Sequence, residues 1–463
     1  MSQPLPVREL YMPAHFGNSW EVAGPHEMRA HLTEAKFWGF NRYADWFDSQ
    51  DLYDPYEPAN NRLKMVNLPE AMWQQKFRGF QIAAELGLEL TLGTTPNHVF
   101  SDQLRQARRA TEGEDIFGQL LCPSDPEARA IILKNQENLF RDFASRGLTL
   151  ASLSLAPYDY GGCRCEACAP YIVTFGRLCR EIGELGRSFF PELEVNLIGW
   201  WWQEEEHRLL AEWADREAPG YFRALAFHLP YGEVAYDRGQ KPMPAGCAAR
   251  AFVHISYNEE AGWRDIYGHL GPVIAPVRLE ATVEFLRQDG AEGFMAYNEG
   301  AHADVNVALL GGLASGQYDS AQAVLQAYAE RHFGGNGREW AALLTALGTP
   351  WEADLAGARG EFDRLAATAP PSWRVEQLDC KLRMLEAHAR VMDEDEWNAR
   401  RLAAAEDYWR AKETLWRQVW GLGMMSRAIF AFDRYGLPAW QQEYEDARGG
   451  RLSGGGTLIS AEA

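Results

Sequence analysis

The sequence lacks long apolar runs, because glycine or charge interrupts each stretch well before the roughly 20 residues that a bilayer requires. The opening stretch, "MSQPLPVRELYMP", has neither the basic start nor the apolar run of a secretory signal. Basic side chains number 45 against 65 acidic ones, and a formal net charge of −20 disfavours binding to phosphate backbones and anionic membranes. We therefore expect a cytoplasmic protein that binds neither nucleic acid nor membranes.

Cysteine is also scarce. Seven cysteines in 463 residues is an odd number that argues against a disulfide framework and fits a reducing compartment. Hydrophobic residues make up 46% and charged residues 24%, a composition typical of soluble globular proteins, and the length indicates two or three structural units. Three of the cysteines nevertheless lie within six positions, in "YDYGGCRCEACAPY" at 158–171, and this cluster needs an explanation.

Short apolar, β-branched runs alternate with helical patterns as far as "EGFMAYNEG" at 292–300, which predicts βα units and a parallel sheet. A glycine-rich phosphate-binding turn is missing after the first run, so we expect neither a dinucleotide-binding sheet nor an organic cofactor. Eight repeats favour an α/β fold of the (β/α)8 TIM-barrel class. The predicted strands are "RELYMPAH", "FNRYADWFD", "LELTLGTTPNHVF", "LTLASLSLAPYD", "LEVNLIGWWW", "FRALAFHLPYG", "ARAFVHISYNEE" and "EGFMAYNEG".

The helical segments set the expected domain boundaries. A helix is predicted in "DPEARAIILKNQENLFRDFASRG", where Ser124 or Asp125 caps the start and Gly147 the end, whereas "EVAYDRGQKPMPAGCAAR" at 233–250 has the pattern of a loop. We expect a catalytic barrel over 1–336, an α-helical C-terminal domain over 337–448 and a flexible glycine-rich tail over 449–463. The tryptophan-rich helix "WRAKETLWRQVWGLGMM" either forms a homodimer or packs on the barrel.

The carboxyl ends of the strands meet at one mouth of a TIM barrel, so the polar and aromatic residues that end the eight segments define the predicted active site. Carboxylates and aromatic rings at one mouth suit glycoside hydrolysis, which needs a proton donor, a second carboxylate and surfaces that stack on sugars. The residues at this mouth are His15, Trp46, Asp48, His98, Tyr158, Asp159, Trp201, Trp202, His228, Tyr257, Asn258, Glu259, Glu260, Asn298 and Glu299.

Asp159 and Glu299 are the preferred catalytic pair, because each follows a strand on a different wall of the predicted pocket. Glu259 and Glu260 are the alternatives, and only one of these neighbours is expected to face the cavity. Carboxyl groups about 5 Å apart would predict retention of the anomeric configuration, and a separation of about 6.5 to 9.5 Å would predict inversion. The other residues of the mouth are assigned to substrate binding.

The clustered cysteines have three interpretations. Cys163, Cys165 and Cys168 follow the fourth strand and Cys122 follows the third, so the two loops are expected to be neighbours. Four thiolates can complete a closed tetrahedral zinc site with a structural role, bracing the loop that carries Asp159. A redox-active cysteine pair and a set of unligated thiols are the alternatives.

Two sequence segments and the helical C-terminal domain carry a resemblance to known enzymes. "SLAPYDYGGCRCEAC" and "AYNEGAHADVNVALLGGLASGQYDSAQAVLQAYAERHFG" are similar to segments of TIM-barrel glycosidases of the alpha-glucuronidase and beta-N-acetylhexosaminidase type and of their uncharacterised bacterial relatives. The resemblance implies functional roles for Asp159 and Glu299, and it assigns Asp304 and Asn306 to the turn after the last strand. Such hexosaminidases usually carry an aspartate–glutamate pair where this chain has Asp159 and Tyr160, which leaves the acid unassigned.

These patterns together predict a glycoside hydrolase that removes a terminal sugar, acidic or N-acetylated, from oligosaccharides or glycosides. Two alternatives stay open: a carbohydrate-binding barrel without catalysis, and a metal-dependent barrel hydrolase or lyase.

Overall fold

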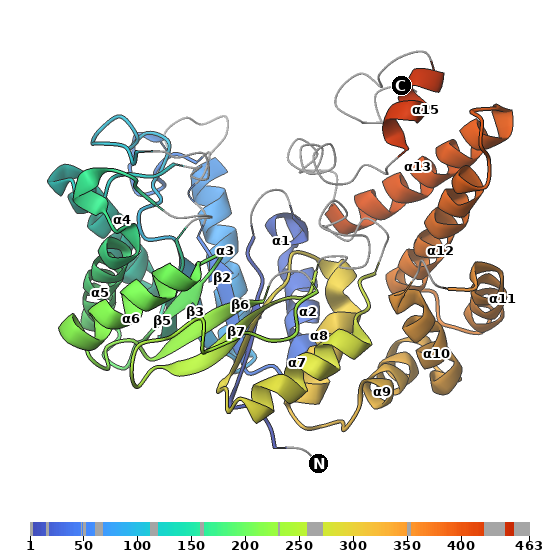
Figure 1. Ribbon diagram of the computed structural model, residues 1–463, viewed down its shortest axis with the longest axis horizontal. Helices are drawn as coiled ribbons and strands as arrows, with labels where there is room; N and C mark the ends of the chain where they lie inside the picture. The colour runs from blue at the N-terminus through green and yellow to red at the C-terminus, as the bar shows by residue number, and fades with distance from the viewer. Residues whose placement is uncertain are drawn as a thin grey trace.

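The computed structural model describes residues 3–14, 18–47, 49, 52–60, 68–111, 119–157, 162–229, 232–256, 272–349, 353–420 and 440–448. Eight parallel strands form a closed barrel in the order of the chain, and β1 closes the ring by pairing with β8 from Val7↔Gly293 to Tyr11↔Tyr297. The predicted TIM barrel is confirmed (Figure 1). The strands are β1 (Val7–Tyr11), β2 (Arg42–Trp46), β3 (Glu89–Thr94), β4 (Leu150–Leu155), β5 (Glu194–Gly199), β6 (Ala224–Leu229), β7 (Ala248–His254) and β8 (Gly293–Tyr297).

Helices cover the outside of the barrel. The predicted helix is α4, where the Asp125 side chain caps the start by accepting a hydrogen bond from the Ala128 backbone N–H at 2.9 Å, and Gly147 follows the end with φ of 69°. Residues 232–247, between β6 and β7, contain no helix, as their glycines and prolines predict. The helices that accompany the strands are α1 (Ser19–Val22), α2 (Pro25–Phe37), α3 (Leu68–Glu85), α4 (Pro126–Ser145), α5 (Tyr171–Phe189), α6 (Glu204–Glu217), α7 (Pro276–Gln288) and α8 (Asp304–Ala314).

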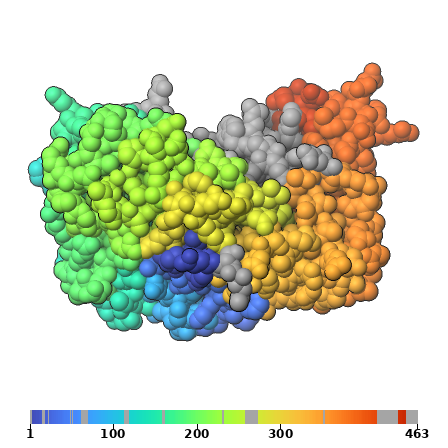
Figure 2. Space-filling view, turned by 60° about the horizontal axis from the view of Figure 1, so that its bottom comes forward, coloured from blue at the N-terminus to red at the C-terminus, as the bar shows by residue number. Residues whose placement is uncertain are grey.

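A helical region follows the barrel, and in Figure 2 its surface is continuous with that of the last βα units. Arg374 at the start of α12 forms an ion pair with Asp304 at the start of α8, with Nε and Oδ2 2.6 Å apart. Within the described residues, no helix has the length and apolarity needed to cross a bilayer. The helices of this region are α9 (Ala321–Phe333), α10 (Gly337–Gly348), α11 (Leu355–Ala366), α12 (Trp373–Met392), α13 (Ala399–Trp420) and α15 (Gln441–Ala447).

Two buried clusters form because side chains alternate along each strand. Outward-facing residues of the strands pack under the helices. In this outer cluster the ring centroid of Phe143 lies 4.8 Å from that of Phe77 and 4.8 Å from that of Phe80, and all three side chains are fully buried. Burial of each such ring contributes about 1.5 to 3 kcal/mol. The inward-facing residues form a separate cluster inside the barrel, which includes Tyr11 and Tyr297. This inner cluster carries the candidate site.

Candidate active site

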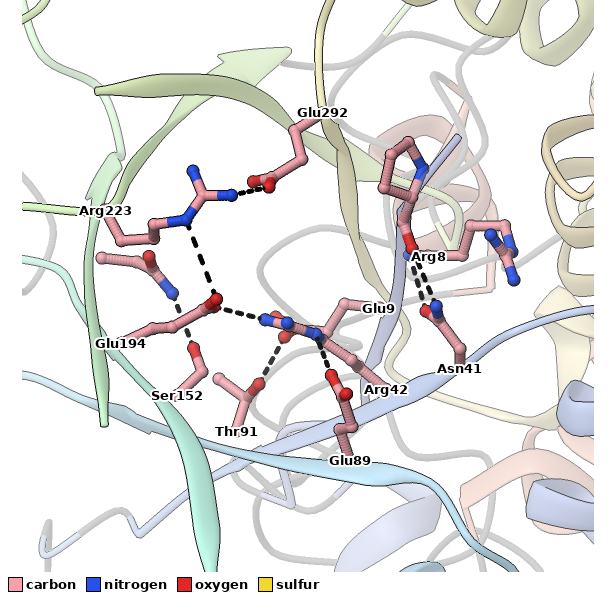
Figure 3. A network of polar contacts seen from close by, with 12 residues as sticks. Arg8, Glu9, Asn41, Arg42, Glu89, Thr91, Ser152, Glu194, Arg223 and Glu292 are labelled. Carbon is pink, nitrogen blue, oxygen red and sulfur yellow. Dashed lines mark hydrogen bonds and ion pairs between the residues drawn. The ribbon is translucent and has the colours of Figure 1, made fainter. Parts of the chain in front are cut away.

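The N-terminal end of the barrel interior is closed by a network of charges (Figure 3). Arg42 forms ion pairs with Glu89 at 2.6 Å and with Glu194 at 2.8 Å. Arg250 pairs with Glu292 at 2.8 Å and with Glu194 at 3.4 Å. Burial alone would raise the pKa of Glu194, but the surrounding guanidinium groups outweigh it and lower that pKa below its usual value. Paired charges at this end of a barrel stabilise the fold and leave the opposite end for chemistry.

Aromatic rings and histidines line the C-terminal end of the interior, which we call the mouth. Trp200, directly after β5, is central to it: its ring stacks on His228 at 5.7 Å and lies 5.0 Å from Phe252 and 5.5 Å from Tyr297. Trp200 is only partly buried. Its indole Nε1 is buried and has no hydrogen-bond partner among the described residues. The mouth therefore contains a partly exposed aromatic residue whose N–H is directed into the interior.

Two buried histidines of the mouth form a hydrogen-bonded pair. The Nε2 atoms of His228 on β6 and His254 on β7 are 2.8 Å apart. The backbone N–H of Trp201 donates to His228 Nδ1 at 3.2 Å, so the neutral His228 ring carries its proton on Nε2 and donates it to His254. Burial lowers the pKa of His228 to about 3 and holds the pKa of His254 well below its usual value. Both rings are neutral at pH 7.

One described carboxylate lies at this end of β8. Glu299 is 3% exposed, and its Oε1 accepts a short hydrogen bond from the Tyr297 hydroxyl. The Glu299 backbone N–H donates to Ser256 Oγ at 2.8 Å. Asn298 Oδ1 accepts from Ser256 Oγ at 3.1 Å and from the Gly300 N–H at 2.9 Å. These contacts fix the turn after β8 and aim the Glu299 side chain toward the rings of the mouth.

The structure brings several of the predicted mouth residues to one end of the barrel. Trp46 ends β2, and its ring lies 6.0 Å from that of His98. The Trp201 ring contacts His228 at 4.5 Å. Asn298 and Glu299 follow β8. Eight predicted site residues lie outside the described residues: His15, Asp48, Tyr158, Asp159, Tyr257, Asn258, Glu259 and Glu260.

The three tryptophan side chains of "GWWW" at 199–202 do not all point to the mouth. Trp201 has a left-handed backbone, with φ of 55°, and this turn directs the next side chain away from the mouth. Trp202 packs instead in the outer core against Phe175 at 5.9 Å and His207 at 5.3 Å. The prediction that Trp202 faces the mouth is therefore wrong, and Trp200 takes that place.

Sequence reasoning missed four mouth residues: Tyr11, Trp200, His254 and Tyr297. The signal that could have found them is the period of two along a strand, because Tyr297 and Glu299 share a face and so do His254 and Ser256. Asp304 and Asn306, which the resemblance assigns to the turn after the last strand, lie in the first turn of α8, and their side chains contact other segments. Asn306 accepts a hydrogen bond from the Ala275 N–H at 2.9 Å and donates to Ile255 O at 2.9 Å.

The four predicted metal ligands come together beside the mouth. The Sγ atoms of Cys122, Cys163, Cys165 and Cys168 all lie within 4.8 Å of one another, and all four residues are buried. They belong to the same inner cluster as Trp46 and Tyr297. The described residues contain no other group of three or more histidine, cysteine or acidic side chains placed to share an ion.

Comparison with known proteins supports the fold. The chain matches no protein-family model and no curated protein. It is similar to the solved structure of a family 89 glycoside hydrolase from Clostridium perfringens in complex with PUGNAc, at 10% identity and a TM-score of 0.54, covering 89% of this chain and 54% of that one. It is also similar to a GH138 enzyme targeting pectin rhamnogalacturonan II, at 10% identity and a TM-score of 0.50, covering 96% and 62%. The chain thus spans less than two thirds of either structure.

Proposed function

We propose that this chain is a glycoside hydrolase that removes a terminal sugar at the mouth of the barrel, with Glu299 as one of its two carboxylates. The observation that carries the proposal is the Glu299 side chain, which is buried after β8 and accepts a hydrogen bond from Tyr297 beside a wall of aromatic rings. Solved glycoside hydrolases share the barrel and so support the same class.

The chemistry of glycoside cleavage requires one group to protonate the leaving oxygen and one carboxylate to stabilise or attack the cation-like sugar centre. A carboxylate held in one orientation by a phenol suits the second role. We assign that role to Glu299. We assign the acid to the loops after β4 and β7, with Asp159 preferred and Glu259 as the alternative.

The rest of the mouth suits a sugar. The partly buried Trp200 ring provides an apolar face on which sugar C–H groups stack, and its indole N–H provides a donor for a hydroxyl. His228 and His254 are neutral and so act as hydrogen-bonding groups that do not compete with Glu299 for charge. We propose Trp46, His98, Trp201 and Asn298 as further substrate-binding residues.

The test is the turnover of Glu299→Gln and Asp159→Asn on a panel of nitrophenyl glycosides that includes uronic acids and N-acetylhexosamines. We expect kcat to fall about 1000-fold in Glu299→Gln, because the amide keeps the shape and removes the charge. Glu204→Gln is the matched control, since this exposed glutamate at the start of α6 undergoes the same chemical change. It is expected to keep wild-type turnover.

Several outcomes would overturn the proposal. A kcat for Glu299→Gln within about tenfold of wild type would remove Glu299 from the chemistry. Calorimetry that shows sugar binding by the wild-type protein without turnover on a broad glycan panel would favour a carbohydrate-binding barrel. Loss of turnover on chelation, with the fold intact and the cysteine-bound metal retained, would favour a metal-dependent hydrolase or lyase.

A further inference from the structure

We propose that Cys122, Cys163, Cys165 and Cys168 bind one Zn²⁺ in a closed four-thiolate site that ties the loop after β3 to the loop after β4. The proposal stands apart from the glycosidase assignment, because it rests on the arrangement of the thiols alone.

The distances between the sulfurs match a zinc tetrahedron. Four sulfurs at about 2.3 Å from a central zinc form a tetrahedron whose edges are about 3.8 Å. Cys122 Sγ lies 3.7 Å from Cys165 Sγ and 3.6 Å from Cys168 Sγ. A disulfide needs sulfurs about 2.05 Å apart, and all four cysteines are free. The cluster therefore has the spacing of four ligands that share an ion.

The backbone around the thiols is ordered by contacts between three segments. The Thr111 N–H donates to Cys163 Sγ at 3.3 Å, and the Arg164 N–H donates to Thr111 O at 3.0 Å. The Cys122 N–H donates to Arg108 O at 2.9 Å. Such contacts to the ligands and their neighbours hold a metal site in one geometry. Arg108 and Thr111 belong to the loop after β3, so the contacts of Thr111 with Cys163 and Arg164 tie that loop to the loop after β4.

The ligand set decides both the metal and its role. All four donors are thiols, which suits zinc, and every position of a tetrahedral ion would be filled by protein. A site with no open position binds no substrate and has a structural role. Cys163 lies four positions after Asp159 in the sequence, so the zinc would fix the chain that leads from the proposed acid.

The direct test is the metal content of the full-length protein, expressed with added zinc and purified without chelators. We expect about one zinc per chain by inductively coupled plasma mass spectrometry, and four thiols that react with a thiol reagent only after chelation or denaturation. Replacing zinc with cobalt should give the thiolate-to-metal charge-transfer bands of a tetrahedral site. This cobalt readout needs no variant and therefore does not depend on how well a mutant folds.

Variants locate the site. Cys165→Ser and Cys168→Ser should each lose the zinc, whereas Cys247→Ser should keep it, because Cys247 is a buried cysteine in the loop before β7. A wild-type chain without zinc, one that contains iron or a disulfide among these four cysteines, or a Cys165→Ser variant with the full zinc content would each overturn the proposal. None of these measurements uses a sugar, so a failed zinc site and a failed glycosidase assignment remain distinguishable.

Discussion

The two ends of the barrel interior differ in chemistry. At the N-terminal end, arginines from β2 and β7 both pair with Glu194 of β5, and Arg250 also pairs with Glu292 just before β8, so each of these charges meets an opposite one. At the mouth, the described side chains are rings around a neutral histidine pair, and the Glu299 carboxylate accepts a hydrogen bond from a phenol. The same eight strands supply both ends.

This difference separates stability from function along the strands. Ion pairs that cross from strand to strand hold the ring closed, and removing a buried arginine takes away a partner from carboxylates that are only partly exposed. The mouth instead holds hydrogen-bond donors and a carboxylate for a ligand. These groups do little to stabilise the protein when no ligand is bound. Substitutions at the two ends should therefore change different measurements.

The largest effect on stability is expected from Arg250→Met. Arg250 is 4% exposed, and its guanidinium pairs with Glu292 and Glu194. The free energy of unfolding should fall by about 2 to 3 kcal/mol, less than for an isolated buried pair, because both carboxylates are partly exposed and keep Arg223 as a partner. Urea denaturation measures this change, and kcat per folded molecule should match that of wild type.

The control for Arg250→Met is Arg208→Met, since Arg208 on the surface of α6 also pairs with two glutamates. Its removal should leave the urea midpoint unchanged, because exposed ion pairs are screened by water. Equal urea midpoints for the two variants would show that the charge network does not hold the barrel closed.

The second-largest expected effect is a change of stability with pH. His228 has a pKa of about 3 in the folded protein and about 6.5 when unfolded, so the unfolded chain binds the extra proton as pH falls below 6.5. This histidine therefore lowers stability by about 2 kcal/mol between pH 7 and pH 5. Between pH 7 and pH 5, the free energy of unfolding of His228→Gln should therefore fall by about 2 kcal/mol less than that of wild type, as measured by urea denaturation. If the free energy of unfolding changes with pH in the same way for both proteins, His228 takes up its proton as readily in the folded protein as in the unfolded chain, and the prediction is wrong.

The barrel could be predicted from the sequence because each strand is short, apolar and bounded by turn residues. Each of the eight predicted segments overlaps an observed strand, and the lack of a helix over the described residues 232–247 followed from prolines and glycines. Glu299 follows β8, His228 lies one residue before the end of β6, and the four cysteines lie in the loops after β3 and β4, so the order of the strands predicts one end of the barrel for all of them.

The positions of the remaining side chains could not be predicted, because they depend on contacts between residues that are far apart in the sequence. Arg42 and Glu194 are 152 positions apart, and only closure of the ring brings them together. Trp200 and Trp202 are chemically identical neighbours in one run, and the left-handed turn at Trp201 decides which one enters the mouth. His254 and Tyr297 are the last residues of β7 and β8, and the site residues predicted from those two segments all lie beyond them.

The smallest effect tests the contact that distinguishes the mouth from the charged end. Tyr297→Phe keeps the ring that packs against Trp200 and His254 and removes only the hydroxyl that donates to Glu299. A lost hydrogen bond to a charged group costs about 1.5 kcal/mol, so kcat on the best glycoside of the panel should fall about tenfold. Tyr236→Phe is the matched control, because its hydroxyl donates to the Asp289 carboxylate at 2.5 Å between the β6–β7 loop and the end of α7. If both variants keep wild-type kcat, the Tyr297 hydroxyl has no role in turnover, and other contacts position Glu299.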